Sequence, residues 1–168
     1  MTIAILFSSS RAAGDTFQIV KYLSDNSAFQ MFNLSEHNIS FYDYEHQNNA
    51  DDFLPLMAKL VQFEHIIFAT PMYWYSMCAQ MKVFIDRLSD LLTIDKPLGR
   101  QLRGKQCSLI STGYDSKAPD CLWQPFELTA KYLGMHYKEM LYLSCPSDFK
   151  LADHKVTLDN FIDNVLTC

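Results

Sequence analysis

The residues with the clearest chemical potential stand near the amino end, in Ser8-Ser9-Ser10-Arg11-Ala12-Ala13-Gly14-Asp15-Thr16. This loop lies between an apolar run and a segment with helical periodicity. Hydroxyl groups, a guanidinium and the free N–H groups of a helix start all favour an anion such as phosphate. A serine-rich turn with Asp15 or Thr16 as helix cap accounts for the same residues, so both interpretations stay open.

A second candidate set is aromatic and follows the apolar run 65–70. Thr70-Pro71-Met72-Tyr73-Trp74-Tyr75-Ser76 joins that run to a segment with apolar residues at helical spacing. Aromatic side chains at the end of a strand are well placed to contact a planar ligand. The same side chains are equally expected in a core or in a subunit contact.

A third loop, Thr112-Gly113-Tyr114-Asp115, follows the apolar run 106–112. Gly113 permits a close backbone approach to a ligand. Taken singly, the segment is an ordinary glycine turn. Whether this loop contributes to a binding site depends on where the fold places it relative to the first two loops.

The elements that must position these loops alternate strictly between strand and helix. Strands are predicted over 2–7, 28–34, 65–70, 106–112 and 135–143, and helices over 15–25, 52–63, 76–93, 121–133 and 153–166. Such alternation predicts a single domain over 1–168, a three-layer α/β/α sandwich with a five-stranded parallel sheet. Right-handed crossovers favour the flavodoxin-like strand order 2-1-3-4-5.

In that order, the loops after the first, third and fourth strands meet at one edge of the sheet. A phosphate site at one end and aromatic side chains at the other together predict flavin mononucleotide (FMN).

Composition narrows the function classes. The 168 residues carry a formal charge of -5, and the 14 Lys and Arg are scattered, which argues against nucleic-acid binding. No apolar stretch is long enough to span a membrane and no leader is evident, so we expect a cytoplasmic protein. No two of the five cysteines form a C-x-x-C pair, and we expect neither an iron–sulfur cluster nor another metal site, although His37 and His46 lie in a polar stretch.

The absence of several sequence motifs excludes further function classes. The chain has neither G-x-x-x-x-G-K-[ST] nor G-x-G-x-x-G. It therefore lacks the sequence fingerprints of nucleoside-triphosphate-binding and dinucleotide-binding proteins. The first loop contains no cysteine, which excludes a cysteine phosphatase on the same fold.

Two irregular segments interrupt the alternation. Residues 34–51 are long for a connection, which indicates a pocket wall or a dimer contact. Residues 95–105 carry Lys96, Arg100, Arg103 and Lys105, which favour either an anionic substrate or simply a solvated loop.

Across nearly the whole chain, the sequence resembles the NAD(P)H-dependent FMN reductase family of the flavodoxin-like superfamily. The resemblance rests on Ser9-x-Arg11 with Gly14-Asp15-Thr16, on Thr70-Pro71-Met72-Tyr73-Trp74, and on Ala79-Gln80-Met81-Lys82-x-Phe84-Ile85-Asp86-Arg87. The second of these motifs is the most specific.

The resemblance implies which residues bind FMN. The phosphate would be held by Ser9, Arg11, Asp15 and Thr16, and the ring would be lined by Pro71, Met72, Tyr73, Trp74, Tyr75 and Ser76. Thr112, Gly113 and Asp115 would close over the ring or the ribityl chain. The resemblance also implies a homodimer or homotetramer with the flavin near a subunit interface.

Three departures from the family pattern concern the site. Ser8 and Tyr75 stand where glycine is usual, and Asp15 stands where asparagine is usual. An ionised Asp15 would repel a phosphate dianion, which favours a helix-capping role turned away from the ligand. Asp86 and Arg87 are expected to form a structural pair on a helix surface.

These features predict a flavin-dependent oxidoreductase that takes hydride from NADH or NADPH and passes electrons to a small-molecule acceptor. The flavin supplies the chemistry, so no catalytic side chain is expected. A flavodoxin-like electron carrier and a redox sensor without nicotinamide turnover are the alternatives. The sequence identifies neither the acceptor nor the preferred nicotinamide, nor whether FMN is tightly bound or exchangeable.

Overall fold

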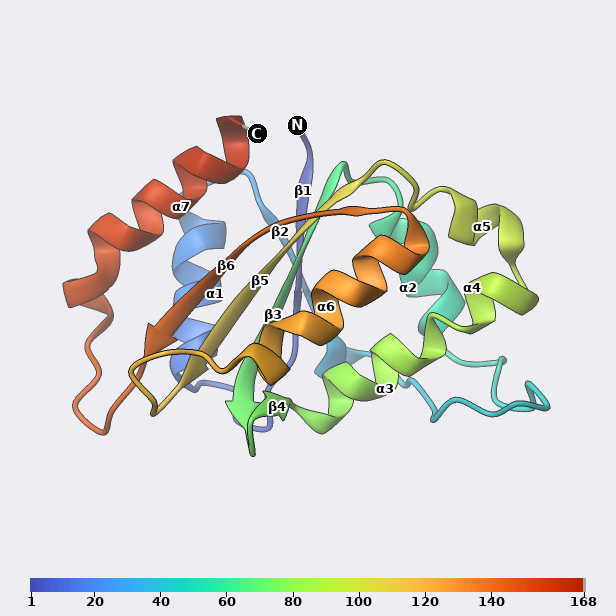
Figure 1. Ribbon diagram of the computed structural model, residues 1–168, viewed down its shortest axis with the longest axis horizontal. Coiled ribbons are helices and arrows are strands. Elements are labelled where there is room, and N and C mark those ends of the chain that lie inside the picture. Colours follow the sequence, from blue (N-terminus) through green and yellow to red (C-terminus); the bar gives the residue numbers. More distant parts are fainter. Residues whose placement is uncertain (168) are drawn as a thin grey trace.

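The computed structural model describes residues 1–167, which fold around a twisted parallel sheet (Figure 1). Its strands are β1 (Ile3–Phe7), β2 (Gln30–Asn33), β3 (His65–Tyr73), β5 (Gln106–Gly113) and β6 (His136–Ser144). They pair in the order β2-β1-β3-β5-β6, all in parallel. The predicted flavodoxin-like topology is therefore confirmed, with β5 and β6 as the fourth and fifth parallel strands.

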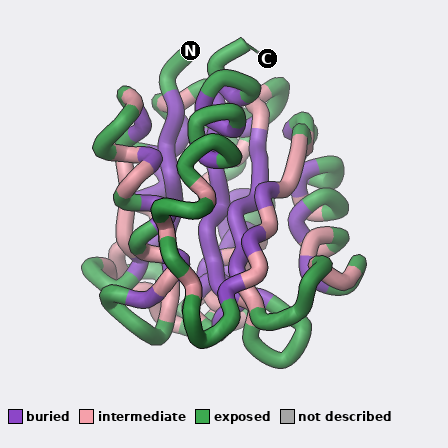
Figure 2. The backbone as a smooth tube through the Cα atoms, turned by 90° about the vertical axis from the view of Figure 1, so that its left-hand side faces the viewer, coloured by how far each residue is buried: buried purple, intermediate pink, exposed green. Residues whose placement is uncertain are grey.

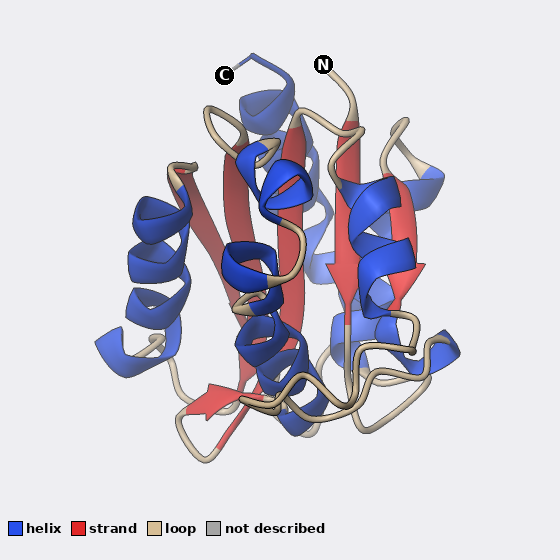
Figure 3. Cartoon of the chain, turned by 90° about the vertical axis from the view of Figure 1, so that its right-hand side faces the viewer, coloured by secondary structure: helices blue, strands red, loops and turns tan. Residues whose placement is uncertain are grey.

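Helices cover both faces of the sheet, as Figure 3 shows. On one face, α1 (Asp15–Asp25) and α7 (Lys155–Thr167) pack over one apolar cluster. On the other face, α2 (Phe53–Leu60), α3 (Ala79–Arg87) and α6 (Asp120–Leu133) pack over a second. Because both faces are covered, β1 is buried at every position and reads as a continuous apolar run (Figure 2).

The predicted helix over 76–93 was wrong at its start and in its continuity, although helix does end at Thr93. Residues Ser76–Met77 form a short strand, β4, that pairs antiparallel with the end of β3. Helix α3 ends at Arg87, and a separate short helix, α4 (Asp90–Thr93), follows. The periodicity could not reveal these breaks, because the apolar side chains on both sides of them still face the core.

The predicted loop 95–105 contains another short helix, α5 (Lys96–Arg100), which begins with Asp95 accepting a hydrogen bond from the Leu98 N–H at 3.0 Å. Two 3₁₀ turns complete the chain, η1 (Leu34–Glu36) and η2 (Leu151–His154). Among residues 1–167, no helix has both the length and the apolar character needed to cross a bilayer.

Arg87 anchors the long connection that follows η1. Its side chain is 1% exposed, its Nε donates to Asp90 at 2.7 Å, and its Nη1 donates to the Ser40 carbonyl and to Asp51. Burial alone would raise the pKa of Asp51, but hydrogen bonds from Arg87, Ser40 and Phe53 lower it overall. The connection is thereby held against α3 and α4.

The surface pair expected between Asp86 and Arg87 was therefore wrong. Asp86 instead pairs with Lys82 on the exposed side of α3, while Arg87 points inward. Asp90, three residues later in the chain, and Asp51, 36 residues earlier, together satisfy the buried guanidinium, and the contact with Asp51 cannot be read from neighbouring residue types.

His65 is a buried titratable group at the start of β3, far from the carboxyl ends of the strands. Its Nε2 lies 3.0 Å from the Ser108 hydroxyl oxygen. Burial lowers the pKa of His65 to about 4, since a charged imidazole is poorly solvated there.

We predict that the free energy of unfolding falls as the pH is lowered from 6.5 to 4. In that pH range His65 is protonated in the unfolded chain but remains neutral in the folded chain. The free energy of unfolding therefore falls by up to ~1.4 kcal/mol for each pH unit. Urea unfolding across this range should show a shallower pH dependence for His65→Gln than for the parent. His136→Asn, at an exposed position on β6, should keep the parent slope. Equal slopes for the His65→Gln variant and the parent would contradict the prediction.

Candidate functional site

The principal cleft opens at the carboxyl ends of the central strands. It has a volume of about 470 Å³, within the range of small-molecule sites. It is lined by Ser9, Arg11, Gly14, Asp15, Thr16, Pro71, Met72, Tyr73, Trp74, Thr112, Gly113, Tyr114 and Cys145. Segments far apart in the sequence thus meet there, because parallel strands bring their ends to one edge.

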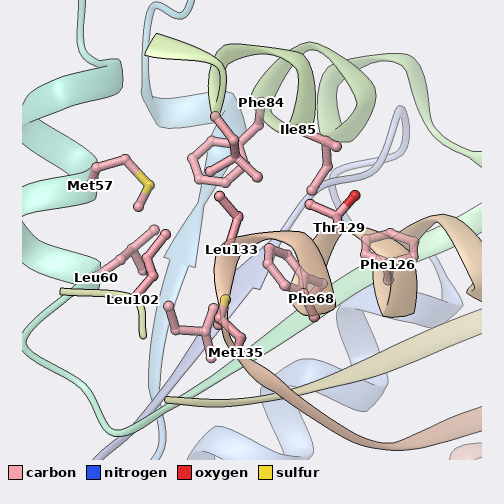
Figure 4. A pocket seen from close by; sticks show the side chains of 13 residues that line it. Met57, Leu60, Phe68, Phe84, Ile85, Leu102, Phe126, Thr129, Leu133 and Met135 are labelled. Carbon is pink, nitrogen blue, oxygen red and sulfur yellow. The ribbon is translucent and has the colours of Figure 1, made fainter. Parts of the chain in front are cut away.

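A second hollow is enclosed by apolar side chains between α2, α3 and α6 (Figure 4). Its free volume is about 10 Å³, which is at most the space of one water molecule. It is a packing gap in the core.

The loop between β1 and α1 forms one end of the cleft. The Arg11 N–H donates to the Ser9 hydroxyl at 3.2 Å, and that hydroxyl lies 3.5 Å from the Tyr73 hydroxyl. Helix α1 starts at Asp15 after Gly14, and no side chain caps it. Its first-turn N–H groups therefore face this end of the cleft with the positive end of the helix dipole.

Asp15 does not take the capping role expected of it. Gly14 is the N-cap of α1, and Asp15 is the first helical residue and lines the cleft beside Arg11 and Thr16. Burial raises the pKa of Cys145 to about 12, and the negative charge of Asp15 contributes to the rise. The carboxylate is therefore near enough to the Cys145 thiol, another residue of the cleft lining, to disfavour its ionised form.

A buried pair of hydroxyls joins the first and third loops. The Thr16 and Thr112 hydroxyl oxygens lie 2.7 Å apart, and both residues are buried. One hydroxyl donates to the other, so the accepting one keeps its own hydrogen for a further acceptor. This arrangement can hold an oxygen atom of a ligand at the junction.

The turn between β3 and β4 forms the aromatic end. Tyr73 pairs with Ser76, and the two residues between them have positive φ, 50° at Trp74 and 65° at Tyr75. This is the geometry of a type I′ hairpin, which large side chains adopt at a cost of roughly 1–2 kcal/mol per residue. Trp74 is 93% exposed, and the Cys121 thiol donates to the Tyr75 carbonyl at 3.4 Å.

The loop after β5 is held in place by hydrogen bonds from β6 and from the residue that follows β6. The Cys145 N–H donates to the Gly113 carbonyl at 2.7 Å, and the Tyr142 hydroxyl donates to the Asp115 carbonyl at 3.0 Å. A Cβ on Gly113 would lie 2.6 Å from the Tyr142 hydroxyl and 2.8 Å from Met72 Cε. A side chain at this position would therefore have to displace the ends of the Tyr142 and Met72 side chains.

Further buried hydroxyls lie next in the chain to residues that line the cleft. Ser8 donates to Gln80 Oε1 at 3.0 Å and accepts from the Cys78 thiol at 3.2 Å. The Thr70 hydroxyl accepts from the Cys78 N–H at 3.0 Å, and Ser111 donates to the Thr70 carbonyl at 2.8 Å. These bonds connect the ends of β1, β3 and β5 to the start of α3.

Most of the predicted site residues come together in this cleft. Of the predicted set, Ser9, Arg11, Asp15, Thr16, Pro71, Met72, Tyr73, Trp74, Thr112 and Gly113 line it, whereas Tyr75, Ser76 and Asp115 do not. Gly14 and Tyr114 line it and stand within the two loops that the sequence singled out. Cys145 also lines it, but no sequence signal marks it, because it enters from the end of β6.

Neither irregular segment reaches the cleft of its own chain. Residues 37–52 are held against α3 and α4 by Arg87, so the interpretation as a wall of this pocket was wrong. The basic residues of 95–105 precede β5 and lie at the amino edge of the sheet, where Lys105 donates to the Phe63 carbonyl. They cannot bind an anionic substrate within this cleft.

Comparison with known proteins agrees with this geometry. The family model of NADPH-dependent FMN reductases matches residues 1–147. The chain belongs to this family. Family membership confirms the predicted class of FMN-dependent oxidoreductase, with FMN as cofactor and a reduced nicotinamide as co-substrate.

Relatives of the family differ in their described roles. The chain is 28% identical over 148 residues to the putative NAD(P)H-dependent FMN-containing oxidoreductase YwqN of Bacillus subtilis, covering 82% of each chain. It is 30% identical over 158 residues to KefG of Shigella dysenteriae, a glutathione-regulated potassium-efflux system ancillary protein, covering 83% of this chain and 82% of KefG.

The solved structure of FerB from Paracoccus denitrificans, a flavoenzyme NAD(P)H:acceptor oxidoreductase, shares the fold. Its TM-score is 0.76 at 16% identity, and the match covers 97% of this chain and 93% of FerB.

We predict that Thr16 and Thr112 stabilise the site as a coupled pair. Thr16→Val or Thr112→Val alone leaves a buried hydroxyl without its partner and should lower the free energy of unfolding by about 1–3 kcal/mol. The double variant should cost less than the sum, since neither hydroxyl then remains. Urea unfolding of all four proteins measures the coupling, and strictly additive losses would contradict it.

Proposed function

We propose that this protein takes hydride from NADH or NADPH onto bound FMN and delivers the electrons to a small-molecule acceptor. The observation that carries the proposal is one cleft with an anion-binding end and an aromatic end, built from three separate loops. The family of the chain and the NAD(P)H-dependent activity in the name of YwqN support it.

The residues present fit FMN. Arg11, the start of α1 and the Thr16–Thr112 pair suit the phosphate and ribityl oxygens, since all of them can donate hydrogen bonds. Pro71, Met72, Tyr73 and Trp74 suit the ring, which needs apolar and aromatic surface. When bound, FMN supplies the acceptance of hydride and the onward transfer of electrons.

The chain's own residues have binding and shielding roles in this proposal. Arg11 and the first-turn N–H groups of α1 orient the phosphate, and the close packing at Gly113 shapes the opposite wall. Tyr73 and Trp74 exclude water from the ring face. No side chain is assigned a proton-transfer step, because hydride transfer to a flavin does not require one.

The test is an absorption titration of the purified protein with FMN, followed anaerobically by one equivalent of NADPH or NADH. We expect FMN to bind and its visible band to bleach faster than in a protein-free control. Arg11→Gln should weaken FMN binding by about tenfold or more, because it removes a charge-assisted hydrogen bond. Lys59→Gln, which changes an exposed basic residue in the last turn of α2, is the matched control and should bind as the parent does.

Binding without bleaching would instead favour a flavin-binding protein without nicotinamide turnover. The similarity to KefG, an ancillary protein by name, favours this second candidate. Failure to bind any FMN would contradict both candidates. The predicted cytoplasmic location remains a prediction.

We also propose that the chain forms a homodimer through a groove between α3–α4 and α6. Two adjoining hollows of about 350 and 200 Å³ share Leu92, Tyr132 and Leu133. Leu128 and Tyr132 stand on its rim, 62% and 76% exposed. An apolar groove with exposed side chains of this size is typical of a covered surface.

Charge distribution along the groove supports a second copy as its occupant. The hollow at one end is lined by Lys96, Arg100 and Arg103, whereas the hollow at the other end is lined by Asp86. A two-fold axis packs α6 antiparallel against its copy, so each basic end meets an acidic end.

Light scattering coupled to gel filtration tests this interface. Leu128→Glu should convert a dimer to a monomer, because it buries a charge in the contact. Val156→Glu, at a 74% exposed apolar position on α7, should leave the dimer intact. A monomeric parent, or an unchanged mass for Leu128→Glu, would contradict the proposal.

A further inference from the structure

The charges at the anion-binding end of the cleft nearly cancel. Among its lining residues, Arg11 is the only Lys or Arg and Asp15 is the only Asp or Glu. Within residues 1–167 neither side chain forms an ion pair with another protein group. Both charges therefore remain to act on a ligand.

Asp15 opposes the features that attract an anion. It is the first residue of α1, and it lines the cleft with Thr16 and Gly14. Within residues 1–167 no ion pair holds its carboxylate elsewhere. A ligand dianion placed there meets one full positive charge, one full negative charge and the partial charge of a helix dipole.

The negative charge of Asp15 is expected to lower the affinity of the cleft for an anionic ligand. Two like charges a few ångströms apart repel each other strongly where water is partly excluded. The remaining contacts of the cleft, namely the hydroxyl pair and the aromatic end, carry no charge.

We infer that Asp15 sets flavin specificity, so that the cleft holds FMN little more tightly than the phosphate-free flavin riboflavin. The inference rests on the proposed function, because it concerns the same cleft. Its consequence is that FMN exchanges readily, and that flavins without a phosphate are also accepted as substrates.

The test is equilibrium binding to the full-length protein freed of flavin, followed by the quenching of FMN and riboflavin fluorescence. The parent should bind the two flavins with dissociation constants within about tenfold of each other. Asp15→Asn keeps the side-chain shape and removes the charge. It should strengthen FMN binding at least tenfold and change riboflavin binding less than twofold, since only FMN carries the charge.

Asp25→Asn is the matched control. Asp25 ends the same helix and pairs with Lys21 on the surface, so its variant should leave both dissociation constants unchanged. A role of Asp15 in helix stability alone would alter thermal unfolding but not the ratio between the two flavins.

The outcomes separate this inference from the proposed function. A parent that binds FMN at least a hundredfold more tightly than riboflavin, with an Asp15→Asn variant unchanged within twofold, would overturn the inference and leave flavin binding intact. A parent that binds neither flavin would overturn the proposed function and the inference with it.

Discussion

The parallel alignment of β1, β3 and β5 is the constraint on which the site depends. In the ladder, Ile5 lies opposite Ile67, which lies opposite Ser108. The three strands thus end near one level, and the loops that follow them share one edge. A cleft at that edge is a property of the topology, and the residue types in the loops decide what it binds.

Short side chains convert this alignment into a rigid site. Ser8, Thr70 and Ser111 stand at the ends of the three strands, and each is fully buried. Their hydroxyls form hydrogen bonds with the start of α3 and between β3 and β5, because a buried polar group without a partner is costly. The relative positions of the strand ends are therefore specified by hydrogen bonds that an all-apolar edge would lack.

Two other features carry energetic costs that the surrounding structure offsets. Arg87 is buried with two carboxylates, and removing either partner would leave an uncompensated charge. The positive φ values of Trp74 and Tyr75 are unfavourable for large side chains. The first feature fixes the connection 37–52 away from the cleft, and the second fixes the aromatic turn beside it.

The sequence alone determined the sheet order, the cleft edge and most of the lining. Apolar runs that alternate with helical stripes are sufficient for these predictions, because burial of a strand or of one helix face fixes the spacing of apolar residues within each element. Tertiary structure alone decided what depends on distant contacts. It paired Arg87 with Asp51 instead of setting it on a surface, brought Cys145 into the cleft, and placed Asp15 in the cleft lining instead of at the helix cap. Each of these outcomes depends on which elements pack together, and spacing along the chain does not record that.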